Sequence, residues 1–514
     1  MMPDSTIFVG FVATLLTIFL FDRLLRAARN FARLPLPPGP KGLPFVGNVR
    51  DLPKQDTFEA VHWAKFGELY GPISSINVLG KTIIVVNDAK TAIDMLEKQS
   101  TYSSRPQFYF TGEIVGWGDT TVSLSYNEKL RSHRKNFARI IGTKSSTAQY
   151  HAMQEAEVAH FLLHLLDDPD NLRDHIKRQV RLPNSNLHDA ASSNPGQYWV
   201  DVLPILRHVP DWVPGTGWKR LARKWASELN TAIELPYAFV EHQMAEGRRN
   251  LSFVANLISS SSNTAEETHS NKWSSATLYS GGADTTVSTV ACFFLAMTQY
   301  PDVQAKAQAE IDRVVGTGRL PVIGDRDNLP YVEAIVKETL RWHTVLPLCV
   351  PHTREEETTY GGYRIPGGAL ILPNVWSFTH DSSIYRDPEV FRPERHLSIE
   401  SNQPEMDPRK FVFGFGRRVC PGRVFAENTL FLDFAQSLAV FNFEKPIVNG
   451  QVMEQKLDSM PGTISHVGAY ETRIRPRSAQ HEGMVRSLEK KYPWQNSDRG
   501  TLNRLRIPAV VMPV

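Results

Sequence analysis

The residues from Phe413 to Gly422 constrain the fold of this chain more than any other stretch. Three glycines and one proline surround a single cysteine, Cys420, in the sequence FGFGRRVCPG. Glycine is favoured where the backbone needs a positive φ or approaches another group closely, so the stretch predicts a tight loop against a flat surface. A helix is expected over residues 425–434, with its positive end toward the sulfur. Cys420 is therefore a candidate metal ligand, and the alternative is a buried structural cysteine beside a glycine-rich turn.

Five residues of this stretch match, position for position, the heme-binding signature of the cytochrome P450 family of heme-thiolate monooxygenases. They are Phe413, Gly416, Arg418, Cys420 and Gly422. The chain resembles that family, and the resemblance implies heme b as cofactor, with the Cys420 thiolate as the axial ligand of the iron. It also implies that Phe413 and Gly422 belong to the cofactor-binding loop. The Arg418 guanidinium is expected to pair with a heme propionate.

The length of the chain, 514 residues, would by itself predict about three domains. The resemblance implies instead one large, mostly α-helical domain with a small β region over residues 45–495, followed by a C-terminal tail at 496–514. A β-branched alternation over Ile73–Asn87 predicts a hairpin of that β region. The net charge of +3 is too small to indicate nucleic-acid binding. The 3 cysteines are widely spaced, so neither a disulfide framework nor a CxxC metal site is indicated.

An apolar run near the start, Ile7–Phe21, carries no charge and is followed by several arginines. A cleaved signal peptide is the alternative, but its basic residues would precede the apolar run and a small-residue cleavage site would follow it. The run therefore predicts a single-pass membrane anchor over residues 1–23, with the rest of the chain in the cytosol. The resemblance implies the endoplasmic reticulum membrane. Residues 24–44 are a basic, proline-rich hinge that proline keeps extended.

A long apolar stretch predicts the central helix over residues 272–300. Gly281 and Gly282 stand in its middle, where each glycine costs about 1 kcal/mol, and tight helix packing is one alternative explanation for them. The resemblance implies that these glycines open a groove for dioxygen and that the helix bulges there. It implies that Asp284 and Thr285 form the acid–alcohol pair that relays protons in catalysis.

Glu338 and Arg341 lie three residues apart on one face of a predicted helix that begins near Pro330. On spacing alone, a weak pair on the surface is the simpler interpretation. Both residues match the family's Glu-x-x-Arg motif, and Arg395 matches a segment that sends a second arginine to the same glutamate. The resemblance therefore implies a buried network of Glu338, Arg341 and Arg395 that holds the loop with Cys420.

Two more basic residues, Arg134 and His352, match positions that contact the heme propionates in the family. Leu130 stands where the family carries a tryptophan, which removes an indole N–H donor and predicts looser heme retention. The family has His-Arg at the second place, whereas this chain has His352-Thr353-Arg354, so the arginine is displaced by one position.

The chain is shorter than family members around residues 179–197. The residues on both sides fit the family, but a turn-forming tract, 181–196, stands where members carry most of a core helix. We expect this tract to be irregular and exposed. The missing helix would leave apolar surface uncovered and cost several kcal/mol of a stability that is typically about 5–15 kcal/mol. Our hypothesis is that altered splicing or gene annotation shortened the product.

Together these features predict a heme-dependent monooxygenase that inserts one oxygen atom of O2 into an apolar organic substrate. The apolar stretch Val345–Pro351 and the aromatic run Phe108–Phe110 are expected to line its pocket. The resemblance is nearest to fungal members that oxidise secondary metabolites or xenobiotics, such as polycyclic aromatics or steroids. It implies electrons from NADPH through a flavoprotein reductase.

The reductase is expected to dock on a basic face near the cysteine, formed by Arg409, Lys410, Arg417 and Arg423. Two other classes of protein stay open. One is a reductase-independent heme-thiolate isomerase or peroxygenase, against which the acid–alcohol pair argues. The other is an inactive, truncated heme-binding protein.

Overall fold

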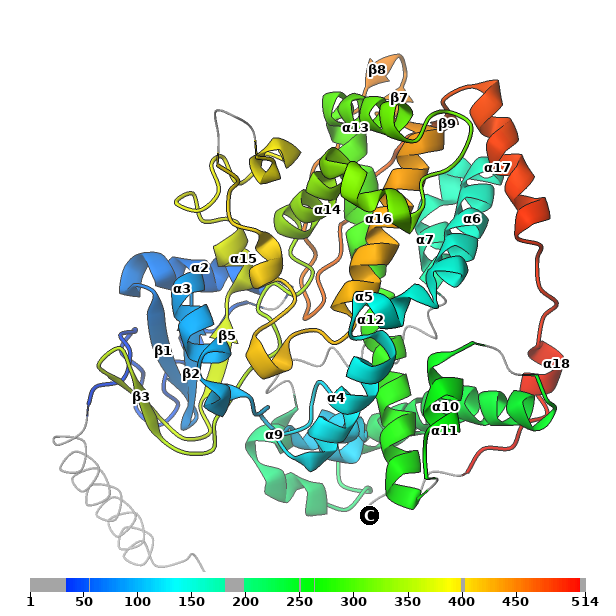
Figure 1. Ribbon diagram of the computed structural model, residues 1–514. Coiled ribbons are helices and arrows are strands. Elements are labelled where there is room, and N and C mark those ends of the chain that lie inside the picture. The colour runs from blue at the N-terminus through cyan, green and yellow to red at the C-terminus, as the bar shows by residue number, and fades with distance from the viewer. Residues whose placement is uncertain are drawn as a thin grey trace, which may run out of the picture.

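The structure is a computed structural model that describes residues 34–508 apart from 55, 181–197, 249–250, 263 and 399–402 (Figure 1). The predicted membrane anchor, the first part of the hinge and the tract 181–196 therefore lie outside the described residues. Within the described part of the chain, no helix is both long enough and apolar enough to cross a membrane.

Helices are the dominant regular structure of the described chain and strands are few and short, which confirms the predicted class of a mostly α-helical fold with a small β region. The helices are α2 (Glu59–Tyr70), α3 (Ala89–Ala92), α4 (Glu128–Ile141), α5 (Lys144–Ala148), α6 (His151–Asp167), α7 (Leu172–Val180), α9 (Trp199–Val202), α10 (Gly217–Ala245), α11 (Phe253–Ser259), α12 (Ala265–Gln299), α13 (Pro301–Val314), α14 (Pro330–Trp342), α15 (Val375–Thr379), α16 (Arg423–Val440), α17 (Ala479–Lys491) and α18 (Arg499–Leu502). The strands are β1 (Ile73–Val78), β2 (Lys81–Val86), β3 (Thr358–Tyr360), β4 (Tyr363–Ile365), β5 (Leu370–Pro373), β6 (Phe441–Glu444), β7 (Ile447–Val448), β8 (Gln451–Val452) and β9 (Arg473–Pro476).

The central helix, α12, runs through the middle of the helical part of the molecule (Figure 1). It begins at Ala265, earlier than predicted, because the Thr264 hydroxyl accepts a hydrogen bond from the Glu267 N–H at 3.3 Å and caps the helix. The first turns are polar, so the apolar stretch did not reveal them. All of α12 is α-helical, so the bulge that the resemblance implied is absent from this structure.

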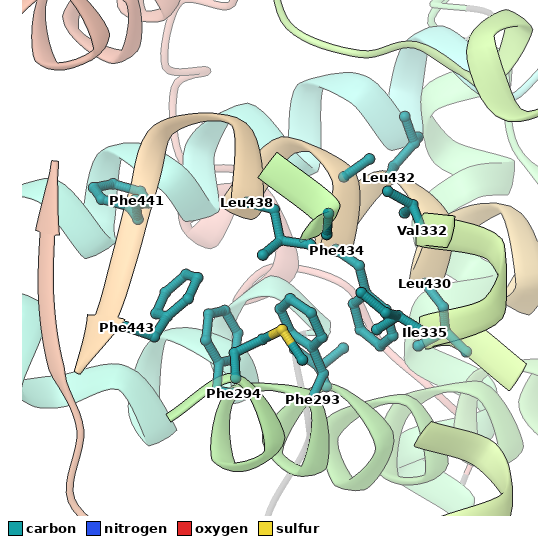
Figure 2. Packing of buried hydrophobic residues seen from close by; sticks show 14 of the residues in the cluster. Phe293, Phe294, Val332, Ile335, Leu430, Leu432, Phe434, Leu438, Phe441 and Phe443 are labelled. Atoms are coloured by element: carbon teal, nitrogen blue, oxygen red, sulfur yellow. The ribbon is translucent and has the colours of Figure 1, made fainter. Parts of the chain in front are cut away.

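The largest apolar cluster joins α12, α14, α16 and β6, and Figure 2 shows its phenylalanines meeting between these elements. Phe293 of α12 stacks on Phe434 of α16 with ring centroids 3.9 Å apart, and Phe294 meets Phe443 edge-on at 5.0 Å. Each fully buried phenylalanine contributes roughly 1.5–3 kcal/mol. This packing fixes α16, which begins directly after the cysteine loop, against the central helix.

Strands β1, β2, β3 and β5 lie at one side of the helical part, with α2 beside them, whereas β7, β8 and β9 lie near α13 and α17 (Figure 1). β1 and β2 form the predicted antiparallel hairpin, and β5 adds to β2 in parallel. Residues 34–40 contain no helix, as their prolines predicted. Ser75 of β1 binds this extended segment. Its hydroxyl donates to the Pro37 carbonyl at 2.6 Å and its N–H donates to the Pro38 carbonyl at 2.9 Å.

The described part of the C-terminal tail packs on the helical domain. It contains α18, which lies beside α10 (Figure 1). The Asn230 side chain of α10 donates to the Pro508 carbonyl at 3.0 Å.

Candidate active site

Cys420 lies in a closed loop directly before α16, as the sequence predicted. Its N–H donates to the Phe413 carbonyl at 2.7 Å. Gly416 has φ +48°, and a Cβ there would lie 2.7 Å from the Leu96 carbonyl oxygen, so the loop requires glycine at this position. Burial raises the pKa of the Cys420 thiol, while a hydrogen bond from the Gly422 amide and the positive charge of Arg134 oppose that rise.

Both ends of this loop pack closely against neighbouring groups. The Arg423 guanidinium covers the ring of Phe413 at 5.5 Å. At the other end, a Cβ on Gly422 would lie 3.9 Å from the Leu278 side chain, which places α12 next to the loop.

Three arginines surround the cysteine loop: Arg105, Arg134 and Arg418. Within the described ranges their hydrogen bonds end on backbone carbonyls, for example from Arg105 to Val350 at 2.7 Å and from Arg134 to Val419 at 2.8 Å. Burial lowers the pKa of Arg418 to about 9, with a further contribution from the charges of the other two. The three positive charges therefore lie close together. No carboxylate among the described residues forms an ion pair with them.

The acid–alcohol pair lies on α12 beside open space. The Thr285 hydroxyl donates to the Gly281 carbonyl at 2.7 Å, and the buried Asp284 carboxylate contacts His466, with Oδ2 and Nε2 3.1 Å apart. A Cβ on Gly281 or Gly282 would meet no atom within 4 Å, so tight packing does not explain these glycines. The sequence did not single out His466, because its loop carries no recognisable motif.

The structure brings Glu338, Arg341 and Arg395 together in one fully buried network. Arg341 donates to Glu338 from Nε at 2.9 Å and from Nη2 at 2.8 Å, and Arg395 Nε donates to the same carboxylate at 3.0 Å. His396 adds a contact of 2.9 Å that sequence reasoning missed. Burial alone would raise the pKa of Glu338, but Arg341 and His396 outweigh it and lower the pKa to about 2.

Comparison with known proteins identifies the family. A sequence profile described as Cytochrome P450 matches residues 37–172 and 184–464. The chain belongs to the cytochrome P450 family. Cytochrome P450 monooxygenase 208 of Postia placenta is 42% identical over 501 residues, which cover 93% of this chain and 97% of that protein. O-methylsterigmatocystin oxidoreductase of Aspergillus flavus is 38% identical over 516 residues, with 95% and 96% covered.

A solved structure of a zebra fish cytochrome P450 with abiraterone has the same fold. The TM-score is 0.64, the sequences are 21% identical, and the match covers 82% of this chain and 100% of that one. This P450 is thus an enzyme of the monooxygenase family, whose members bind heme b and use O2 with electrons from redox partners.

The residues around Cys420 fit heme b. A cysteine sulfur is available for the iron, and the uncompensated arginine cluster suits the two propionate carboxylates. Two buried nitrogens, Arg105 Nε and His352 Nε2, have no hydrogen-bond partner among the described residues, and a propionate carboxylate would accept from the Arg105 Nε–H. Arg105 was missed from the sequence, because a single arginine in a loop carries no signal.

The sequence departs from the family's propionate contacts at two places, at Leu130 and at the displaced Arg354. The structure shows a different environment at each. Leu130 is 1% exposed and fills the inner side of α4 as an apolar residue. His352 Nδ1 donates to the Tyr102 carbonyl, 2.8 Å away, and burial holds the pKa of His352 well below the usual range. Arg354 points to Glu356 at 3.2 Å instead. Arg105 is thus a buried guanidinium close to Arg418, whereas the displaced Arg354 pairs with an exposed acid.

The basic face near the cysteine is smaller than the sequence predicted. Arg409 is bound to Asp407, Glu333 and Glu427, and Arg423 pairs with Glu427 at 2.7 Å, so their charges are largely neutralised. Lys410 and Arg417 are exposed. Arg409 and Arg423 therefore add little positive charge to this face, because Asp407 and acids of α14 and α16 pair with them.

The two stretches expected to line a pocket meet in part. Phe108, Val350 and Pro351 border a small cavity of about 50 Å³ beside Arg105. Phe110 does not border this cavity. Its ring is fully buried and stacks on Tyr198, with the ring centroids 3.5 Å apart.

Proposed function

We propose that this P450 inserts one oxygen atom of O2 into an apolar small molecule, with electrons from NADPH delivered by a flavoprotein reductase. The observation that carries the proposal is the packing of two helices. One begins at the Cys420 loop, and the other carries the Asp284–Thr285 pair beside open space. Bound heme, held by Cys420 and by Arg105, Arg134, His352 and Arg418, would supply the redox chemistry of O2.

The protein side chains then hold the cofactor and handle protons. The arginine cluster would neutralise the propionates, since its members have no acidic partner among the described residues. Thr285 and Asp284 would pass protons toward the open space at Gly281. The buried Glu338 network would keep the loop of Cys420 in place, because α14 and the segment with Arg395 are joined through it.

An apolar secondary metabolite is the substrate class that we favour, with a polycyclic or steroid xenobiotic as a further candidate. The Aspergillus flavus relative is named for O-methylsterigmatocystin, which supports a secondary metabolite. The decisive test is a screen of terpenes, steroids and polycyclic aromatics with purified protein, reductase and ¹⁸O2. We expect product that carries one ¹⁸O atom. Absence of label in the product would contradict the proposal, and turnover with peroxide but without NADPH would favour a peroxygenase.

We expect Thr285→Ala to keep its heme but to lose the coupling between NADPH oxidation and product formation. The variant lacks the hydroxyl beside Gly281, and groups that position protons in this way contribute about 10²-fold or more to a rate. Product and hydrogen peroxide per NADPH are the measurements. Thr298→Ala is the matched control, because Thr298 makes the same bond to the carbonyl four residues earlier, at 2.8 Å, far along α12. Unchanged coupling in Thr285→Ala would remove this hydroxyl from the reaction.

Docking of an acidic reductase on Lys410 and Arg417 should make reduction sensitive to salt. We expect the rate of the first electron transfer to fall as ionic strength rises, and to fall severalfold in a Lys410→Ala, Arg417→Ala double variant. Lys224→Ala on α10, where the side chain is 62% exposed, is the control. A rate that is independent of salt would refute electrostatic docking.

Residues 1–23 are proposed to anchor the enzyme in the endoplasmic reticulum membrane, with the catalytic domain in the cytosol. The support is the uncharged run Ile7–Phe21 followed by arginines. If deletion of residues 2–23 left the protein in the membrane fraction, this assignment would fail.

The shortened region around 179–197 is proposed to weaken the fold. The family profile breaks between residues 172 and 184.

We expect a version with a family-length insert at 179–197 to incorporate more heme and to melt at a higher temperature, because a core helix would cover apolar surface. Heme content per protein and melting temperature are compared between the two versions. Equal values would show that the short form is complete in itself.

A further inference from the structure

We propose that His466 is a positioning residue for Asp284 and connects this buried carboxylate to solvent. The inference rests on the proposed function and adds a residue to its proton path. His466 Nε2 lies 3.1 Å from Asp284 Oδ2. The side chain of His466 is 26% exposed and that of Asp284 is 11% exposed, so the imidazole presents more surface to water than the carboxylate that it contacts.

The backbone around His466 is tied to the same helix that carries Asp284. The Ser288 hydroxyl, one turn further along α12, donates to the Ser465 carbonyl at 2.7 Å. On the opposite side of the loop, the Ser465 N–H donates to the Val345 carbonyl at 2.8 Å, and the Met460 N–H donates to the His466 carbonyl at 2.8 Å. Hydrogen bonds on both sides of the loop therefore fix its backbone and hold the His466 imidazole next to Asp284.

A second histidine, His343, also binds this loop, but it cannot exchange protons with Asp284 in the same way. Its Nε2 lies 3.0 Å from the Ser288 hydroxyl and its Nδ1 lies 3.2 Å from the Ser459 hydroxyl. Burial lowers the pKa of His343 to about 4, so the ring is neutral near pH 7 and acts as a structural tie. His466, by contrast, borders both water and the carboxylate.

The contact has two consequences for Asp284. A buried carboxylate is costly unless a donor pairs with it, and the imidazole N–H is such a donor that also fixes the position of Oδ2. When both ring nitrogens of His466 carry a proton, the imidazolium can pass its Nε2 proton to Asp284 Oδ2 and become a neutral imidazole, which then takes up one proton from solvent. The carboxylate can in this way be reprotonated after each proton that it gives to Thr285.

The test compares His466→Ala and His466→Gln with a matched pair on the same helix. His269 near the start of α12 contacts Asp119 at 3.0 Å, so His269→Gln makes the same substitution in the same kind of pair far from the glycines. We expect His466→Ala to lower product per NADPH at least fivefold with the substrate KM unchanged. His466→Gln keeps a donor, so it should recover part of the coupling but show a larger solvent isotope effect. His269→Gln should match the wild type.

A readout that does not depend on turnover is the melting of the heme-loaded proteins. We expect His466→Ala and Asp284→Asn each to lower the melting temperature, and the double variant to be no lower than the worse single variant, because the two side chains act as a pair. Additive shifts, or wild-type coupling in His466→Ala, would overturn the inference. If wild-type protein with heme forms no product from any substrate, the proposed function fails. The melting temperatures of the single and double variants still test the His466–Asp284 pair in that case.

Discussion

Cys420→Ser is expected to abolish the red-shifted Soret band of the ferrous carbon monoxide adduct and to reduce product formation to background. That band depends on electron donation from a thiolate, which a serine oxygen or water does not supply. The closed loop before α16 is held by backbone hydrogen bonds, including that from the Cys420 N–H to Phe413, and these remain in the variant. The difference spectrum of the reduced protein with carbon monoxide is the measurement.

Cys292→Ala is the matched control for this experiment. Cys292 is fully buried in α12, and burial raises the pKa of its thiol well above the usual range, so it is inert. The control should keep the band. A Cys420→Ser protein that also kept it would exclude Cys420 as the iron ligand.

Glu338→Ala is expected to give protein that is largely heme-free or insoluble. Its carboxylate lies between the guanidinium groups of Arg341 and Arg395, and all three side chains are fully buried. Removal of one partner from a buried ion pair costs about 3–5 kcal/mol, a large part of a typical stability of about 5–15 kcal/mol. Soluble yield, heme content and melting temperature measure the effect.

Glu333→Ala on the same helix is the control for Glu338→Ala. Glu333 also binds two arginines, Arg326 and Arg409, but its side chain is 20% exposed and water can replace the lost contacts. We expect a much smaller loss of melting temperature. Equal losses in the two variants would contradict a special role of the buried network.

The same network predicts how stability depends on pH. The pKa of Glu338 is lowered from 4.5 to about 2 in the folded protein, because Arg341 and His396 outweigh the opposite effect of burial. A lowered pKa of an acid contributes stability that is fully present above the unfolded value and is lost as pH falls through the folded value. We expect this contribution to disappear between pH 4.5 and 2, and to be missing in Glu338→Gln.

Contacts between residues close in sequence were predictable here. The cysteine loop, the hairpin of β1 and β2, and the Glu338–Arg341 pair each depend on a spacing that one loop, turn or helix imposes by itself. The start of α12 was missed for a local reason as well, since its first turns are polar and the Thr264 cap lies before the apolar stretch.

The electrostatic states of charged side chains in the interior, by contrast, were not predictable from the sequence. Arg409 looked like part of a docking face, but acids from three segments neutralise it. Asp433 sits within the apolar part of α16, where burial raises its pKa to about 7 and the Gln179 amide of α7 donates to it at 2.6 Å. Such electrostatic states depend on which groups from distant elements surround a charge.

The sequence by itself determined the family, the iron ligand candidate and the acid–alcohol pair, because these motifs lie within single loops and helices. The tertiary structure alone decided which other residues join them. Arg105 reaches carbonyls at Val350 and Pro351, and His466 reaches Asp284, across stretches of chain far apart in sequence. No local periodicity encodes such contacts, because the packing of the whole helical core brings the partners together.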